Sequence, residues 1–167
     1  LPAEIESLDR YRAHPNLPGM TVPQEMRLTT EIANAITGMD IAVFAVASPY
    51  TRQTAKAAAP FIKENQIIVD VAKGLEQTTH MTLTEVIADV LGMPQIPLVA
   101  LSGPTHAEEV ALEMPTTIVA ASADIRVAEY IQQTFSNEIL RVYTNTDIKG
   151  VEICGALKNI IALAAGI

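Results

Sequence analysis

The sequence predicts an α/β fold in which a mostly parallel sheet is flanked by helices. Short apolar segments alternate with longer segments of helical pattern along most of the 167 residues. The apolar segments are continuous rather than alternating, which is typical of strands buried on both faces. Aromatic residues make up only 4% of the chain and Trp is missing, which favours helices packed on a buried sheet over an aromatic-rich β-sandwich.

The expected elements follow one another in a regular order. About forty polar residues come first, broken by Pro and Gly, and predict a loop followed by a short helix over 24–36. Apolar runs then predict strands over 41–46, 66–72, 97–101, 116–121 and 140–143. The remaining segments predict helices over 51–59, 82–91, 105–113, 123–135 and the final stretch, 150–167.

Turn and capping residues mark several of the boundaries. Ser48-Pro49 ends the first strand, and Pro60 ends the helix after it. Thr105 and Glu108 have the spacing of a capping box, which predicts a helix start, and Thr146-Asp147 can cap the final helix. The strand–helix order is therefore supported by these residues as well as by hydrophobicity.

The final stretch, 150–167, is apolar almost all round, with Lys158-Asn159 in its middle. Such a helix is normally buried, and a desolvated lysine has a lowered pKa that makes it a usable proton carrier near neutral pH. Gly155 and Ala162 lie one turn to either side and leave room for a ligand or another backbone against Lys158. The alternative is a lysine whose head simply reaches solvent.

Three polar segments follow strands, where ligands bind in open α/β sheets: Ser48-Pro49, Lys73-Gly74 and 102–105. Lys73 can attract a phosphate or carboxylate, or polarise a hydroxyl; alternatively it is a strand-end lysine in water. The Ser-Gly-Pro-Thr turn offers backbone N–H groups and a hydroxyl to an anion or a polar cofactor head. Alternatively, Thr105 only caps the next helix.

Composition and residue spacing argue against several other classes of protein. A formal net charge of −8 argues against a nucleic-acid partner. The single cysteine, Cys154, reads as a small buried hydrophobe, and His14, His80 and His106 have no metal-ligand spacing, so we expect neither a disulfide nor a metal site. No stretch has the length of a membrane span and no signal peptide opens the chain, so a cytoplasmic location is expected. The chain contains no Gly-x-Gly-x-x-Gly turn, Walker-type loop or Gly-x-Ser-x-Gly elbow.

Three segments together resemble the NAD(P)-dependent glycerol-3-phosphate dehydrogenases of bacterial type. They are Val-Ala-Lys-Gly-Leu-Glu at 71–76, Leu-Ser-Gly-Pro-Thr-His-Ala-Glu-Glu-Val at 101–110 and Gly-Ala-Leu-Lys-Asn-Ile-Ile-Ala-Leu-Ala-Ala-Gly-Ile at 155–167. They stand in the family's order and with closely similar spacing, and Leu-Pro-Gly at 17–19 also fits. The resemblance covers essentially the whole chain.

The resemblance implies reversible hydride transfer between NAD or NADP and C2 of glycerol 3-phosphate, with dihydroxyacetone phosphate as the ketone, feeding glycerophospholipid synthesis. It implies that Lys158 transfers the proton at the C2 oxygen and that Lys73 touches both substrate and cofactor. Gly103 and Thr105 would line the substrate site, and Ala107 the cofactor site. The residue chemistry agrees, because a carbonyl that becomes an alkoxide needs a nearby cation and a proton donor.

The resemblance also implies an incomplete enzyme. Residues 1–145 would form a partial Rossmann-like nucleotide-binding domain that lacks its first strands and glycine-rich turn, and 146–167 the first helix of a helical substrate domain. Exposed sheet edges would make a homo-oligomer or a domain-swapped dimer one outcome. Two alternatives remain open: a β-hydroxyacid or 6-phosphogluconate type of dehydrogenase, or a non-catalytic Rossmann-like assembly module.

Overall fold

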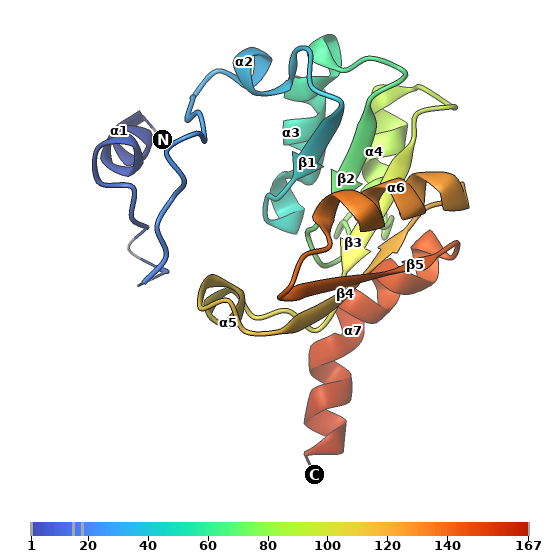
Figure 1. Ribbon diagram of the computed structural model, residues 1–167. Helices are drawn as coiled ribbons and strands as arrows, with labels where there is room; N and C mark the ends of the chain where they lie inside the picture. The colour runs from blue at the N-terminus through green and yellow to red at the C-terminus, as the bar shows by residue number, and fades with distance from the viewer. Residues whose placement is uncertain (1, 15, 18, 167) are drawn as a thin grey trace.

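A five-stranded sheet organises the computed structural model, which describes residues 2–14, 16, 17 and 19–166 (Figure 1). The strands are β1 (Ile41–Phe44), β2 (Ile67–Asp70), β3 (Leu98–Ser102), β4 (Thr116–Ala121) and β5 (Leu140–Asn145), and they lie side by side in that order. Neighbouring strands run parallel except β3 and β4, which are antiparallel. The predicted α/β fold with a mostly parallel sheet is confirmed.

Helices follow the strands as the sequence predicts from residue 41 onward. The structure contains α1 (Pro2–Tyr11), α2 (Ile32–Ile36), α3 (Thr51–Ala58), α4 (Leu83–Leu91), α5 (Ala107–Ala111), α6 (Ile125–Phe135) and α7 (Ile148–Ala165). Short 3-10 turns at Ser48–Tyr50 and Ala59–Phe61 flank α3. The predicted cap of the final helix is confirmed, because the Asp147 carboxylate accepts the Gly150 N–H at 2.8 Å.

Two apolar clusters fill the two faces of the sheet. Ile68 packs on one face with Phe44 and with Ile87 of α4, while its neighbour Val69 packs on the other face with Ile131 of α6. Successive side chains of a strand point to opposite faces, so two adjacent, fully buried residues identify a strand covered on both sides. This burial explains why the apolar runs of the sequence are continuous.

The prediction for the N-terminal forty residues is wrong in two respects. Most of the helix expected over 24–36 is irregular, and only α2 at its end is helical. The Thr29 hydroxyl accepts the Glu31 N–H at 3.0 Å, a local bond that competes with helix formation. Residues expected as loop instead form α1, with Glu4 in its first turn and Arg10 in its last, a charge placement that suits the helix dipole. Pro18 of the 17–19 segment and Ile167 lie outside the described residues.

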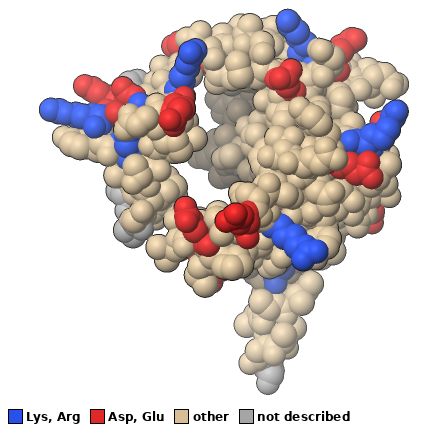
Figure 2. Space-filling model, viewed as in Figure 1, with Lys and Arg blue, Asp and Glu red and all other residues tan. Residues whose placement is uncertain are grey.

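The last helix is only partly buried over its first half and is exposed beyond Lys158, so the expectation of a buried helix is wrong. Figure 1 shows α7 passing the sheet and then projecting beyond it. Ile160, Ile161 and Leu163 are 60–70% exposed, and Cys154, expected to be buried, is also exposed. The protruding end carries no charged side chain, as Figure 2 shows. Its apolar character therefore reflects something other than burial within this chain.

Candidate active site

Two predicted site segments meet at the carboxyl edge of the sheet. Lys73 lies three residues beyond the end of β2, and Thr105 lies three residues beyond the end of β3. The Lys73 ammonium donates a hydrogen bond of 2.7 Å to the Thr105 hydroxyl. Because β2 and β3 are parallel, both segments leave the sheet at the same edge, and the predicted shared location is confirmed.

Lys158 approaches the same place from α7. Both Lys73 and Lys158 are half-buried. Burial, followed by the like charge and hydrogen bonding of Lys158, lowers the pKa of Lys73 below its ordinary value. The pair thus concentrates positive charge at one point, and one of its amines gives up its proton more readily than a lysine in water.

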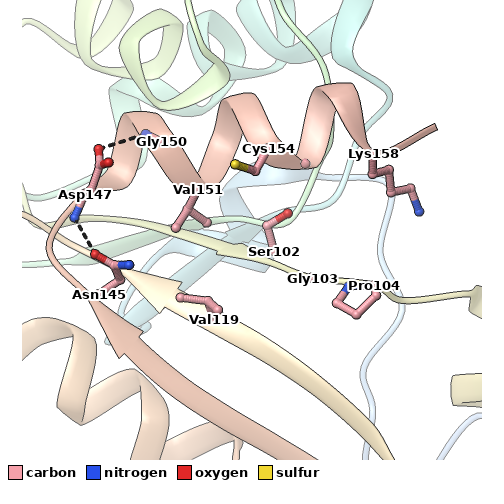
Figure 3. Close-up of a pocket in the computed structure, with 11 residues that line it drawn as sticks. Ser102, Gly103, Pro104, Val119, Asn145, Asp147, Gly150, Val151, Cys154 and Lys158 are labelled. Atoms are coloured by element: carbon pink, nitrogen blue, oxygen red, sulfur yellow. Dashed lines mark hydrogen bonds between the residues drawn. The ribbon is translucent and has the colours of Figure 1, made fainter. Parts of the chain in front are cut away.

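Ser102 and Gly155 bring α7 into direct contact with the sheet. A Cβ on Gly155 would lie 2.6 Å from the Ser102 hydroxyl oxygen and 3.8 Å from the Lys73 side chain. Figure 3 shows the Ser102 hydroxyl pointing toward α7. Ser102 and the stem of Lys73 therefore fill part of the predicted room at Gly155, while Gly155 and Lys158 also line a cavity. Glycine at this position lets the helix carrying Lys158 come close to Lys73.

Two cavities flank this contact. One of about 440 Å³ lies between α7, the end of β3 and the inner part of β4. It is lined by Ser102, Gly103, Pro104, Val119, Asn145, Asp147, Gly150, Val151, Cys154, Gly155 and Lys158 (Figure 3). The other, of about 350 Å³, lies at the carboxyl ends of β1 and β2 and is lined by Ala45, Val46, Ala47, Ser48, Val71, Ala72 and Lys73. Lys158 faces the first cavity and Lys73 the second.

The second cavity lies between the turns that follow β1 and β2. Most of its side chains are small and apolar, and Lys73 supplies the charge. Gly74 next to it has φ +132°, and a Cβ there would lie 3.0 Å from the Ser48 hydroxyl oxygen. The glycine thus lets the turn after β1 pack against the turn after β2, beside the cavity.

Gly103 has a packing role that the sequence did not reveal. A Cβ at this position would lie 2.8 Å from the carbonyl oxygen of Thr117 and 2.9 Å from the Cα of Ile118. These are backbone atoms of β4, which cannot move aside cheaply. Gly103 therefore allows the end of β3 to pass β4 while its backbone lines the first cavity.

We expect Gly103→Ala to lower the free energy of unfolding by about 1–3 kcal/mol, because the added methyl group would overlap the β4 backbone. Urea unfolding of the chain measures the loss. Gly155→Ala is the matched control, since its methyl group would meet a serine hydroxyl that can rotate away. Equal losses for the two variants would contradict this explanation of Gly103.

The predicted capping box at Thr105 is wrong. The α5 helix begins at Ala107, its cap residue His106 makes no side-chain capping bond, and the Thr105 hydroxyl accepts from Lys73 instead. The ammonium donates a charge-assisted bond to this hydroxyl, which is stronger than a capping bond from a neutral backbone N–H. Ala107, predicted to touch cofactor, is exposed in the first turn of α5, two residues beyond Thr105.

Two buried carboxyl groups and one ion-pair network near the site are not predicted from the sequence. Asp70 and Glu152 are 2% and 6% exposed, and both interrupt otherwise apolar segments, which was the available signal. Arg52 of α3 binds Glu76 through hydrogen bonds of 2.7 and 2.8 Å and also binds Asp89 of α4. The bonds from Arg52, and after them the bond from the Thr79 hydroxyl, lower the pKa of Glu76 to about 2. Arg52 thereby connects the segment after Lys73 to α3 and α4.

Sequence profiles of known families match almost the whole chain. A profile of the NAD-dependent glycerol-3-phosphate dehydrogenase N-terminus matches residues 2–128, and one of the C-terminus of the same family matches 147–167. The chain belongs to this family. The membership agrees with the resemblance carried by the segments at 71–76, 101–110 and 155–167, and it separates the chain from the β-hydroxyacid and 6-phosphogluconate alternatives.

Relatives of the glycerol-3-phosphate dehydrogenase family share both sequence and fold with the chain. It is 56% identical to glycerol-3-phosphate dehydrogenase (NAD(P)+) 2 of Lactobacillus delbrueckii subsp. bulgaricus, over 100% of this chain and 51% of that protein. It is 47% identical to the enzyme of Agathobacter rectalis, over 98% of this chain and 48% of that protein. The chain thus spans about half the length of the curated relatives it matches.

Solved structures of family members superpose closely. The glycerol-3-phosphate dehydrogenase of Coxiella burnetii matches with a TM-score of 0.88 at 28% identity, over 98% of this chain and 50% of that one. The Plasmodium falciparum enzyme matches with a TM-score of 0.87 at 25% identity, over 97% and 46% of the two chains. Within the described part of the chain, no helix is both long and apolar enough to cross a membrane.

Proposed function

We propose that this chain carries the lysine pair of an oxidoreductase that interconverts sn-glycerol 3-phosphate and dihydroxyacetone phosphate with NAD or NADP. The observation that carries the proposal is the meeting of Lys73 and Lys158 at the carboxyl edge of the sheet, with the pKa of Lys73 lowered. Family membership supplies the substrate class, since the relatives are glycerol-3-phosphate dehydrogenases. The product would feed glycerophospholipid synthesis.

In the proposed reaction each lysine has its own task. Lys158 gives a proton to the C2 oxygen of the ketone as that oxygen becomes an alkoxide, and takes it back in the reverse direction. Lys73 stabilises the developing negative charge and touches both substrate and cofactor. Gly103 and Thr105 line the substrate side, where the Thr105 hydroxyl also holds the Lys73 ammonium in place.

The cofactor is assigned to the cavity at the ends of β1 and β2. A bound nicotinamide supplies the hydride. The small residues of that cavity would hold the ring, Lys73 would lie at its border with the substrate, and Ala107 would lie on the cofactor side. Charge at Lys73 favours the negatively charged substrate in the same region.

We also propose the arrangement in which 1–145 is a partial nucleotide-binding domain and 146–167 the first helix of a substrate domain. The apolar end of α7 and the edge strand β1, whose Val43 is 47% exposed, are surfaces for pairing in a homo-oligomer or a domain-swapped dimer. Light scattering on the chain tests this, and a monomer at all concentrations would contradict it.

With one cysteine and no disulfide possible within the chain, a reducing cytoplasmic compartment suits the protein.

A chimera tests the proposed function. The matching half of the Lactobacillus delbrueckii relative is replaced by this chain, and NADH and NADPH oxidation is followed with dihydroxyacetone phosphate. We expect oxidation that depends on the ketone and saturates with it. A folded chimera without ketone-dependent oxidation, beside an active parent enzyme, would overturn the proposal and favour the assembly module.

A further inference from the structure

Glu152 is a buried carboxylate on the side of α7 that faces α4. One of its oxygens accepts the Thr84 backbone N–H at 2.9 Å, and the other accepts the Thr84 hydroxyl at 2.5 Å. Thr84 is the second residue of α4, where backbone N–H groups have no partner within the helix. A carboxylate from α7 thus satisfies the positive end of α4.

Burying a carboxylate at this contact costs more folding free energy than burying an apolar side chain would. A buried carboxylate loses its hydration, and a well-packed apolar side chain of similar volume is often at least as stabilising. Glu152 has no lysine or arginine among its hydrogen-bond partners. The nearby Lys149 binds Glu85 at the surface instead. Unlike an apolar residue, the carboxylate forms two directional hydrogen bonds to Thr84. These two bonds fix the rotation of α7 about its own axis.

A second carboxyl group lies close to Glu152. Asp70, at the end of β2, has one oxygen that is buried and has no hydrogen-bond partner. Burial, and after it the charge of Glu152, raises the pKa of Asp70 to about 7. Protonation of Asp70 removes a like charge from the neighbourhood of Glu152, at the interface between β2, α4 and α7.

The anchor lies immediately before the close contact at the site. Gly155 follows Glu152 by three residues, and there α7 touches Ser102 and the Lys73 stem. Lys158 follows by six residues, about 9 Å along the helix axis. A rotation of α7 at Glu152 would therefore move Lys158 relative to Lys73, and a misplacement of about 1 Å is enough to slow a reaction strongly.

We propose that Glu152 is a positioning residue for the dehydrogenase reaction: its carboxylate, bound to the start of α4, fixes the rotation of α7 and holds Lys158 beside Lys73. The inference rests on the proposed function of the two lysines. It predicts that Glu152 acts through geometry, without touching substrate or cofactor.

The kinetic test uses the chimera. Glu152→Gln should lower kcat about tenfold or more, with the KM for NADH or NADPH unchanged, because the amide keeps one acceptor but loses the paired, charged bond. Thr84→Val should lower kcat less than Glu152→Gln does, because the backbone N–H of residue 84 remains as a donor. Thr84→Ser keeps the hydroxyl and should have the kcat of the parent chimera. Glu85→Gln is the matched control: it removes the surface tie to Lys149 and should change kcat less than twofold. A normal kcat in Glu152→Gln, or an equal loss in Glu85→Gln, would overturn the proposal.

A spectroscopic test on the chain itself separates this proposal from the proposed function. The lysines are reductively methylated with ¹³C, and the titration of Lys73 is followed by NMR, with Lys73→Arg assigning its signal. If Glu152 holds Lys158 in place, Glu152→Gln should move the Lys73 midpoint upward by about half a pH unit or more, as the like charge withdraws. An unchanged Lys73 midpoint in Glu152→Gln would overturn the positioning role, whether or not the chimera is active. If the midpoint shifts but the parent chimera is inactive, only the proposed function is overturned.

Discussion

Lys158→Met in the chimera is expected to cut turnover by about a hundredfold or more while leaving the unfolding temperature nearly unchanged. Methionine keeps the length and packing of the half-buried lysine stem and removes only the amine. General acid–base groups contribute about this much to a reaction in which a proton must reach the developing alkoxide. Steady-state oxidation of NADH or NADPH with dihydroxyacetone phosphate, beside a thermal melt, provides the measurement.

Two comparison variants make the result specific. Lys149→Met removes a lysine from the exposed side of the same helix and should leave turnover within about twofold, since its partner is the surface carboxylate Glu85. Lys73→Met should raise the KM for the ketone at least as much as it lowers turnover, because Lys73 also binds substrate. Near-normal turnover in Lys158→Met, or loss of the folded state, would show that the lysine is structural.

The parts of the fold that the sequence predicts are those decided by local patterns. Strands β1 to β5 are continuous apolar runs because the sheet is covered on both faces, and each run survives in the structure as a strand. The location of Lys73 beside Thr105 follows from a general property of parallel strands, whose carboxyl ends share an edge. No tertiary detail was needed for either prediction.

The sequence-based predictions are wrong or incomplete where a residue has more than one possible partner. Thr105 has the spacing of a cap but accepts from Lys73, which lies 32 residues earlier in the chain. Glu152 binds Thr84 across 68 residues, so its sequence neighbours carry no information about its partner. The apolar pattern of α7 predicts burial without saying what covers the helix, and its second half is exposed. Pairings of this kind depend on the packed structure and not on spacing.

Asp70→Asn is expected to stabilise the chain at pH 8 and to have little effect at pH 4. In the folded state the pKa of Asp70 is raised from the ordinary 3.8 to about 7, mainly by burial. Between these two values the folded chain holds a proton that the unfolded chain has lost, so stability falls as the pH rises through this window and is constant above it. Each pKa unit corresponds to about 1.4 kcal/mol, which makes the full effect on the order of 4 kcal/mol.

Asparagine has nearly the same shape as aspartate and cannot ionise, so the variant should lose this part of the pH dependence. Urea unfolding of both chains from pH 4 to pH 8 measures the difference, which should grow with pH and reach roughly 2–4 kcal/mol in favour of the variant. Asp40→Asn is the matched control, because it makes the same chemical change at an exposed carboxyl group just before β1. A difference that is constant across the pH range, or one that favours the parent chain at pH 8, would mean that Asp70 is ionised in the folded protein and has a partner that stabilises its charge.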